Sequence, residues 1–371
     1  MMKIMLVAGA RPNFMKIAPL VRALENQQGE SEDLAWSLVH TGQHYDTEMS
    51  KAFFDDLGIP EPHYHLGIGS GSHAEQTART MVAFEKICLL ERPDVVVVVG
   101  DVNSTLACAI TAKKLLIKVA HVEAGLRSGD MTMPEEINRI VADALSDYLF
   151  VTESSGIHNL SREGRSDSSV HYVGNVMIDT LFFQLERLEK IGTTPRVREL
   201  RERYRSPYAV VTLHRPSNVD ERASLSGILK ALIDIGRDMP VLFPVHPRTR
   251  KNIDRFGLEP PAGANVALLP PLPYMEFLAL WKDAALVLTD SGGIQEETTA
   301  LGIPCFTIRE NTERPVTIAE GTNSLVGTTF GTIMAAYGQF KKGISKRGSV
   351  PFLWDGKAAE RIVSDLRNTL P

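Results

Sequence analysis

The stretch Val95-Val96-Val97-Val98-Val99-Gly100-Asp101 decides the fold class of this chain. Its five valines show no alternation of polar and apolar side chains, so both faces of the strand must be covered, as in a parallel sheet. Further buried-strand candidates lie on either side, and helical patterns separate most of them. One series comprises 3–8, 34–41, 95–100, 119–123 and 148–152; a second comprises 208–213, 241–245, 266–269, 285–289, 303–307 and 324–326. Strands that alternate with helices form doubly wound sheets, so the sequence predicts two α/β domains with a cleft between them.

The domain junction is expected in the charged, helical stretch 185–205, which lies between the two strand series. We assign this helical stretch to the second domain, and we predict an N-terminal domain over 1–175 and a C-terminal domain over 176–355. The last segment, 356–371, is amphipathic, with Ile362, Leu366 and Leu370 on one face. A helix with this pattern is expected to pack back on the first domain.

Composition excludes several classes of protein. The 371 residues include 40 Lys and Arg against 45 Asp and Glu, and the formal net charge of −5 argues against a nucleic-acid binder that uses bulk positive charge. Apolar runs are too short to cross a bilayer, and 4–10 is expected to be a buried strand rather than a signal peptide. The three cysteines lie far apart without metal-ligand spacing. We expect a cytoplasmic protein that binds no metal, membrane or nucleic acid.

The first strand ends in Gly9-Ala10-Arg11-Pro12-Asn13, and Lys16 follows in the next helix. This turn lacks the G-x-G-x-x-G pattern of a dinucleotide site, so NAD is not expected. Because ligands bind at the carboxyl ends of strands in open α/β sheets, Arg11 and Lys16 could hold an anionic group beside the helix N-terminus. The alternative is two solvated surface cations.

Three carboxylates are expected to meet at one sheet edge. Asp101 follows the valine run, Glu123 ends the next strand, and Glu135 lies shortly beyond. Carboxylates that share a cleft can differ in pKa and divide acid and base roles. The alternatives are that Asp101 caps a turn and that Thr132-x-x-Glu135 forms a capping box. Arg139, four residues beyond Glu135, could steer or pair it.

The second series also carries polar groups at its strand ends. His214 and Arg215 follow the first strand of this series, and His246 and Arg248 follow the second. A lone histidine is more often structural than catalytic, but a strand-end position next to an arginine favours a site. In the first series, Gln43 follows the second strand and either faces the cleft or caps the next helix.

The most specific local signal is TDSGGIQEE, residues 289–297, where a buried strand ends in two glycines and a helix begins. Bare backbone N–H groups at residues 291–293 would form a cradle for a diphosphate. Glu297 could accept hydrogen bonds from ribose hydroxyls, and Arg314 follows a later strand of the same region. The alternative, that Glu296 and Glu297 merely complement the helix dipole, does not explain the paired glycines.

Taken together, these motifs make the chain resemble the non-hydrolysing UDP-N-acetylglucosamine 2-epimerases. The resemblance runs nearly end to end through G-A-R-P-N-F-M-K, H-T-G-Q-H, G-D-V-N-S-T, H-V-E-A-G-L-R, M-P-E-E-I-N-R, T-L-H-R-P-S-N, P-V-H-P-R, T-D-S-G-G-I-Q-E-E and T-E-R-P. It implies an α/β fold of two Rossmann-like domains in the GT-B arrangement, with the active site in the interdomain cleft, and a homodimer.

The resemblance implies reversible epimerisation of UDP-GlcNAc to UDP-ManNAc, by anti elimination of UDP to 2-acetamidoglucal and re-addition, with no cofactor. Residue by residue, the motifs and the resemblance assign catalytic roles to Asp101, Glu123, Glu135 and His214, with Asp101 favoured as the base. Substrate contacts are assigned to Arg11, Lys16, Gln43, Arg139, Asn218, His246, Ser291, Gly292, Gly293, Glu297 and Arg314.

One departure and several alternatives accompany this hypothesis. Many bacterial members have H-R-R-E-N where this chain has H-R-P-S-N over 214–218, so allosteric activation by a second UDP-GlcNAc is not carried over. The alternatives are a hydrolysing relative that releases ManNAc and UDP, and a 2-epimerase of a related sugar such as a UDP-linked 2,3-diacetamido uronic acid. A retaining glycosyltransferase and a non-enzymatic nucleotide-sugar sensor are further classes with the same fold.

Overall fold

The computed structural model describes residues 1–29, 33–42, 51–205, 207–344 and 346–369. The chain divides into two compact units. Unit 1 comprises Met1–Phe182 and Phe352–Pro371, and unit 2 comprises Phe183–Pro351. The first division therefore falls within helix α7 (Val176–Ile191), and the chain returns to unit 1 shortly before its last helix. The sequence analysis placed these boundaries at 175/176 and 355/356.

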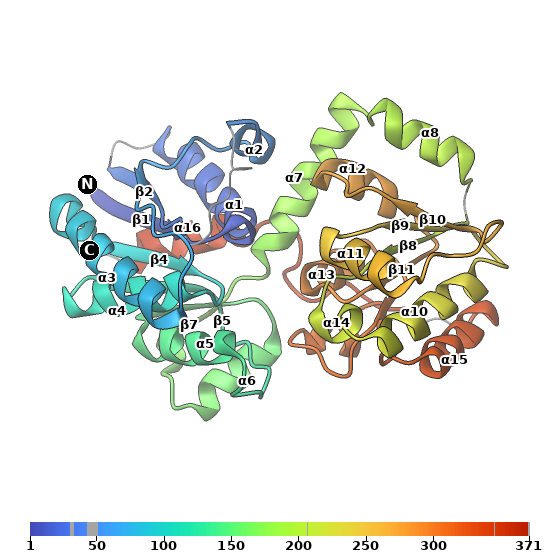
Figure 1. Cartoon of the computed structure of the whole chain (residues 1–371). Coiled ribbons are helices and arrows are strands. Elements are labelled where there is room, and N and C mark those ends of the chain that lie inside the picture. The colour runs from blue at the N-terminus through green and yellow to red at the C-terminus, as the bar shows by residue number, and fades with distance from the viewer. Residues whose placement is uncertain (30–32, 43–50, 206, 345, 370–371) are drawn as a thin grey trace. The chain divides into compact units, whose positions relative to one another are not determined.

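Unit 1 is built on a seven-stranded sheet in the order β3-β2-β1-β4-β5-β6-β7, with parallel pairing throughout (Figure 1). Its strands are β1 (Met2–Ala8), β2 (Leu34–His40), β3 (Tyr64–His65), β4 (Val95–Val99), β5 (Lys118–Ala124), β6 (Tyr148–Val151) and β7 (Val170–Tyr172). Its helices are α1 (Arg11–Gln28), α2 (Lys51–Leu57), α3 (His73–Glu91), α4 (Asn103–Lys114), α5 (Pro134–Leu145), α6 (Ser154–Arg162) and α16 (Ala358–Thr369), with a 3₁₀ turn at Asp167–Ser169. The strand order reverses between β1 and β4, where open α/β sheets bind ligands.

Strand β4 confirms the prediction of a sheet covered on both faces. All five valines are buried. Val95, Val97 and Val99 belong to a core with side chains of α1 and α16, whereas Val96 and Val98 belong to a second core with side chains of α3 and α4. Since successive side chains of a strand point to opposite faces, the unbroken valine run is what a central strand between two helical layers requires.

The C-terminal helix α16 packs against α1 in unit 1 (Figure 1). Ile362 and Leu366 are buried in the same core as Phe14 of α1, while Leu370 lies outside the described residues. The start of α16 is fixed by Asp179 of α7, whose carboxylate accepts the backbone N–H groups of Ala358 (3.1 Å) and Ala359 (2.7 Å). A carboxylate at this position satisfies N–H groups that have no acceptor within the helix.

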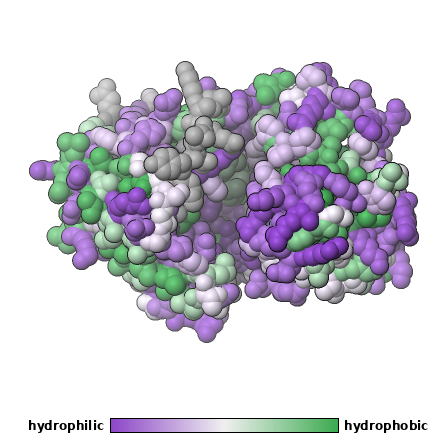
Figure 2. Space-filling view, viewed as in Figure 1, coloured by the Kyte–Doolittle hydropathy of each residue, from purple (hydrophilic) through white to green (hydrophobic). Residues whose placement is uncertain are grey.

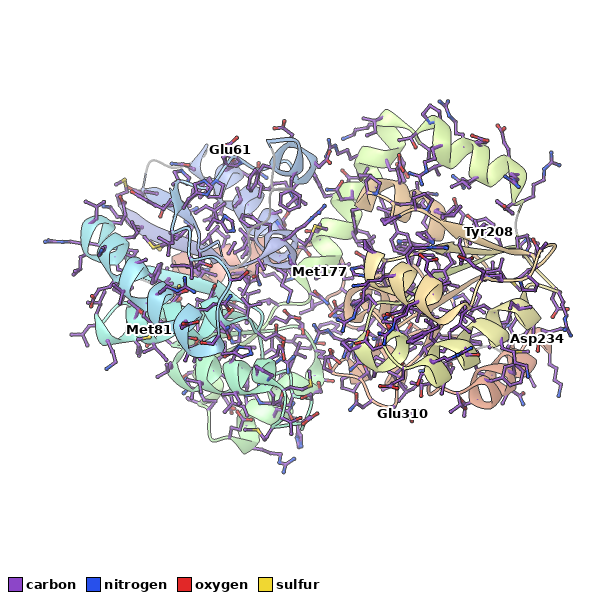
Figure 3. All side chains as sticks on the ribbon, viewed as in Figure 1. Glu61, Met81, Met177, Tyr208, Asp234 and Glu310 are labelled. Carbon is purple, nitrogen blue, oxygen red and sulfur yellow. The ribbon has the colours of Figure 1, made fainter. Side chains whose placement is uncertain are left out.

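Unit 2 repeats the plan with a six-stranded parallel sheet in the order β10-β9-β8-β11-β12-β13. Its strands are β8 (Ala209–Thr212), β9 (Val241–Pro244), β10 (Val266–Leu269), β11 (Leu286–Thr289), β12 (Cys305–Thr307) and β13 (Asn323–Leu325). Its helices after α7 are α8 (Pro195–Arg203), α9 (Pro216–Val219), α10 (Arg222–Ile235), α11 (Pro247–Phe256), α12 (Tyr274–Trp281), α13 (Gly292–Ala300), α14 (Pro315–Ala319) and α15 (Phe330–Lys341). Tyr208, labelled in Figure 3, lies at the start of β8 and donates its hydroxyl to the carbonyl of Leu280 (2.6 Å). The strand order reverses between β8 and β11.

Two short strands at the edges of the first sheet, β3 and β7, were not predicted from the sequence. Each has at most three residues, which is too short to show a periodic pattern. Among the described residues, no helix is long and apolar enough to cross a membrane. All three cysteines are buried and form no disulfide.

Candidate active-site residues in the two units

Glu123 lies at the carboxyl end of β5 and forms an ion pair with Lys16 of α1. Both side chains are largely buried, with 6% and 14% exposed. Glu123 has a φ of +75°, and the pairing of β5 with β6 shifts register around it. A non-glycine residue in this region costs about 1–3 kcal/mol, and such residues cluster at functional sites. The ion pair and the strained backbone together fix where this carboxylate points.

Asp101 lies beyond β4 and is held by Arg139 of α5. The guanidinium donates to one oxygen of Asp101 through Nη2 (2.6 Å) and Nε (3.1 Å). Asn138 donates to the backbone carbonyl of Asp101 (2.8 Å). The side chain of Asp101 remains 28% exposed, so this carboxylate is oriented and still accessible to a ligand.

Arg139 is itself anchored by Glu136, a residue that the sequence analysis missed. Its Nη1 donates to Glu136 (2.6 Å), and Glu136 also accepts the N–H groups of Ser128 and Gly129. Burial alone would raise the pKa of Glu136, but the backbone N–H groups and Arg139 outweigh it and lower the pKa. The ion pair of Arg139 within α5 is thus with Glu136, the neighbour of the Glu135 that was considered from the sequence.

The alternative of a Thr132–Glu135 capping box is also wrong. Helix α5 begins at Pro134 with Met133 as its N-cap, and no side chain caps it. Thr132 instead donates its hydroxyl and its N–H to Asp130. Glu135 therefore stays a half-buried carboxylate in the first turn of α5, where the helix dipole favours negative charge.

A buried cluster supports the turn that follows Glu123. Asp143 of α5 is fully buried and contacts His121 Nδ1 (2.6 Å), Arg127 Nη2 (2.7 Å) and the N–H of Gly125 (3.0 Å). Burial raises the pKa of Asp143, but His121 and Arg127 outweigh this effect and lower it. The other ring nitrogen of His121 faces the carbonyl of Gly100 (2.8 Å). His121 is thus a structural histidine that ties β5 to α5 and to the end of β4.

In unit 2, Asp290 organises the turn after β8. It is fully buried at the end of β11 and accepts the N–H groups of His214 (3.1 Å) and Arg215 (2.9 Å). It also contacts Asn218 Nδ2 (3.1 Å) and His214 Nδ1 (3.0 Å). Burial would raise the pKa of Asp290, but His214, Arg215 and Asn218 outweigh it and lower the pKa. Asn218 is fully buried and supports this turn, because its Nδ2 also donates to the carbonyl of Ile308 (2.9 Å).

His246 lies at the end of β9, and its ring centroid is 6.0 Å from that of His214. Its Nδ1 accepts the N–H of Arg248 (3.2 Å) and so caps helix α11. Burial, His214 and Arg248 lower the pKa of His246. Figure 2 shows hydrophilic side chains over α11, which these histidines adjoin. The first two strands of the second sheet therefore present neighbouring imidazoles.

Helix α13 begins at Gly292, with Ser291 as its N-cap. The predicted cradle is corrected at one position, because the N–H of Ser291 donates to Thr289 Oγ1 (3.0 Å) and is not bare. The N–H groups of Gly292 and Gly293 have no acceptor within the helix by its geometry. A Cβ atom at Gly292 would meet nothing closer than Glu313 Oε1 at 3.9 Å, so space for a ligand remains there.

Glu297 of α13 is almost fully buried. Tyr274 donates its hydroxyl to Glu297 Oε1 (2.7 Å), and within the described residues Oε2 has no hydrogen-bond partner. Burial raises the pKa of Glu297 to about 8. Glu296 pairs with Arg314 (2.6 Å). Neither glutamate lies in the first turn of α13, so the alternative that both only complement the helix dipole is not supported.

The remaining predicted residues have less definite surroundings. Arg11 is exposed, and its guanidinium lies over the ring of Phe53, 5.0 Å from the centroid. Gln43 lies outside the described residues. Over the described ranges, no group of three or more histidine, cysteine or acidic side chains could hold a metal ion.

The fold and the strand-end residues define an α/β protein of two Rossmann-like sheets of the GT-B type. A model of the family described as UDP-N-acetylglucosamine 2-epimerase matches residues 26–367. The chain is 42% identical to the UDP-N-acetylglucosamine 2-epimerase of Methanocaldococcus jannaschii over 98% of each chain. A crystal structure of UDP-GlcNAc 2-epimerase from that organism, in complex with UDP-GlcNAc and UDP, superposes with a TM-score of 0.84, at 42% identity and over 99% of this chain and 100% of that one. A UDP-2,3-diacetamido-2,3-dideoxy-D-glucuronate 2-epimerase from Pseudomonas aeruginosa is 41% identical over 98% of this chain and 99% of its own. The chain belongs to the UDP-N-acetylglucosamine 2-epimerase family.

Proposed function

We propose that this protein interconverts UDP-GlcNAc and UDP-ManNAc by eliminating and re-adding UDP. The observation that carries the proposal is Asp101, an accessible carboxylate that Arg139 fixes at the sheet position where ligands bind. Because this carboxylate is already oriented, little further entropy is lost when it accepts a proton from a bound sugar.

In the forward direction, Asp101 accepts the proton of sugar C2. The electron pair of that C–H bond forms the C1=C2 double bond of 2-acetamidoglucal, and the C1–O bond breaks with its electrons leaving on the UDP oxygen. Glu123 and Glu135 serve as the further acid and base groups that return a proton to the opposite face of C2. UDP then adds back to C1, which gives the epimer with no net redox change.

Unit 2 binds the nucleotide in this proposal. Negative charge grows on the diphosphate as it leaves, and the N–H groups at the start of α13 stabilise an anion at that position. Arg314 and His246 of the same unit add positive or hydrogen-bonding groups for this ligand. Glu297 Oε2, which has no hydrogen-bond partner in the described part of the chain, is suited to accept a hydrogen bond from a ribose hydroxyl.

The test is a proton NMR time course of the protein with UDP-GlcNAc in D2O. UDP-ManNAc with deuterium at C2 of both sugars is expected. Asp101→Asn should lower turnover by about 1,000-fold, in the range of lost general base catalysis, and bind UDP within about threefold of the wild type. Free ManNAc and UDP would overturn the proposal in favour of a hydrolysing enzyme, and unchanged turnover in Asp101→Asn would remove that residue from the role of base.

A second candidate substrate is a UDP-linked 2,3-diacetamido uronic acid, because the Pseudomonas aeruginosa relative named for that sugar is 41% identical to this chain. Parallel assays decide between the two substrates. We expect a higher kcat/KM for UDP-GlcNAc. A ratio in favour of the uronic acid would reassign the substrate while leaving the reaction type in place.

We also propose a cytoplasmic homodimer. Buried thiols without disulfides fit a reducing compartment. Four apolar side chains of unit 1 are 59% to 92% exposed: Val82, Leu89 and Leu90 of α3, and Leu116 after α4. Figure 2 shows hydrophobic residues, in green, on the α3 side of unit 1. Such a patch is typical of an interface. Light scattering should give twice the chain mass, and Leu89→Glu should lower it; a monomeric wild type would refute the homodimer.

A further inference from the structure

The histidines at the strand ends differ in what their ring nitrogens contact. The Nδ1 atom of His214 faces the carboxylate of Asp290 at 3.0 Å, and its ring belongs to a side chain that is 43% exposed. His121 has the same type of carboxylate partner in Asp143, but it is fully buried and its second nitrogen faces a carbonyl. His246 uses Nδ1 as an acceptor for a backbone N–H. Of these three, His214 combines a carboxylate at Nδ1 with a ring that a ligand can reach.

Asp290 is placed so that this contact is rigid. Its carboxylate also accepts the backbone N–H groups of His214 and Arg215 and the side-chain amide of Asn218. Arg215 in turn donates through Nε to the carbonyl of Asp290 (3.0 Å). The backbone of the histidine and its ring are therefore held by one fully buried acceptor, which leaves little freedom to the imidazole.

A carboxylate beside one ring nitrogen fixes the tautomer of a histidine. Since an ionised carboxylate can only accept hydrogen bonds, Nδ1 of His214 must carry a proton, and the lone pair of the neutral ring is then on Nε2. The charged ring carries protons on both nitrogens, and its Nδ1–H still faces the carboxylate. An imidazolium with Nε2–H facing outward is a donor for a diphosphate oxygen.

We propose that Asp290 is a positioning residue that holds His214 in the Nδ1–H form. The Nε2–H of the imidazolium then passes its proton to the UDP oxygen as the C1–O bond breaks, and Nε2 takes the proton back when UDP returns to C1. From the sequence alone, Asp290 is only part of the turn before α13. This inference rests on the proposed function, and it gives His214, which the resemblance to the epimerases marks as catalytic, a contact with the departing UDP. It adds a role for a residue that itself touches no ligand.

The first test uses no substrate. In protein labelled with ¹⁵N-histidine, long-range ¹H–¹⁵N spectra distinguish the two tautomers, and His214→Ala identifies the signal. We expect wild-type His214 to be protonated on Nδ1, and Asp290→Asn to shift it toward Nε2–H, the tautomer that imidazole prefers in water. A wild-type signal from the Nε2–H form would overturn the assignment whether or not the variant folds.

The second test is kinetic. Asp290→Asn keeps the shape of the side chain, so we expect kcat to fall by about 100-fold or more with KM within about threefold, as is typical when the tautomer of a catalytic histidine is lost. The double variant with His214→Ala should be no slower than His214→Ala alone. Asp234→Asn is the matched control, because Asp234 of α10 pairs only with the exposed Arg237 among the ion pairs of the described residues (Figure 3).

The outcomes separate this proposal from the proposed function. Wild-type kcat in Asp290→Asn, or additive losses in the double variant, would overturn the role of Asp290. A wild-type protein that turns over no UDP-sugar would overturn the proposed function, and the tautomer measurement would then decide the Asp290–His214 pairing by itself.

Discussion

Asp143→Asn should strongly destabilise unit 1. The change replaces one carboxylate oxygen of a fully buried side chain with an NH2 group. His121 Nδ1, Arg127 Nη2 and the N–H of Gly125 all point at this carboxylate. The new amide therefore places a donor against a donor and removes the negative charge between two basic side chains.

The magnitude follows from the loss of a buried ion pair. Both His121 and Asp143 are 0% exposed, and breaking such a pair from one side costs about 3–5 kcal/mol. For a domain of 150–250 residues, each kcal/mol lowers Tm by about 2–4 °C, so a fall of about 6–20 °C is expected. The pKa of Asp143 is lowered in the folded state, so its contribution is present above pH 3.8 and is lost as pH falls below that value.

Calorimetry at pH 7 measures the shift in Tm, and hydrogen exchange locates it. Amides of β5 should exchange faster in the variant, whereas those of β8 and β11 in the other unit serve as an internal reference. Asp130→Asn is the matched control, because Asp130 accepts bonds only within its own exposed turn among the described contacts, and a change under about 1 kcal/mol is expected. A Tm for Asp143→Asn within 2 °C of the wild type would refute the reasoning.

Three other predictions follow from buried carboxylates and close backbone approaches. The pKa of Glu313 is lowered to about 2, because Arg314, Arg309 and Arg215 outweigh its burial. Glu313 therefore adds about 3 kcal/mol to the free energy of unfolding above pH 4.5, and this contribution is lost as the pH falls toward 2. In urea titrations the stability of Glu313→Gln should no longer show this dependence on acid, and an unchanged dependence would contradict the prediction. Burial raises the pKa of Glu297 to about 8, and ligand hydroxyls favour its ionised form, so the affinity of the Asp101→Asn variant for UDP-GlcNAc should rise as the pH is raised from 7 to 9. Adding Glu297→Gln should make this affinity independent of pH. Weaker binding at pH 9 than at pH 7 would show that the protonated acid donates to the ligand. Gly125 has a φ of +79°, and Gly125→Ala would place a Cβ atom 2.5 Å from the carbonyl oxygen of Gly156, so the variant should lose more than about 2 kcal/mol of stability. Gly129 has a similar φ of +74° but open space around it, so Gly129→Ala should lose about 1 kcal/mol. Equal losses of stability in thermal unfolding would refute the steric argument.

Most of the fold could be predicted from the sequence because central parallel strands are continuous apolar runs. The valine run of β4 needs no tertiary information to be read as a strand that is covered on both faces. The edge strands β3 and β7 could not be predicted, because two or three residues carry no period and their pairing is decided by the neighbouring strand. The same limit applies to unit boundaries within a continuous helix such as α7.

The site was harder to predict where hydrogen bonds decide between adjacent residues. Glu135 and Glu136 are adjacent residues of the same type, so the sequence does not show which of them faces Arg139. The start of α5 after the N-cap Met133 directs Glu136 toward it. Likewise, Tyr274 precedes Glu297 by a long stretch of chain, so no spacing rule links them. A partial signal existed for Asp290, since a buried aspartate at a strand end requires donors, and the neighbouring strand offers a histidine.

The two units show how one topology supports different chemistry. The six strands of the second sheet follow the same order as the first six strands of unit 1, which has β7 in addition. Asp101 follows β4 and Asp290 follows β11, the strands at which the order reverses in each sheet. Asp101 is held from α5 by Arg139 and keeps 28% of its side chain exposed, so it can meet a substrate. Asp290 is enclosed by the turn after β8, and in our proposal its charge acts on a ligand through His214. What separates the two roles is therefore the supply of donors from neighbouring turns, since fold and residue type are shared.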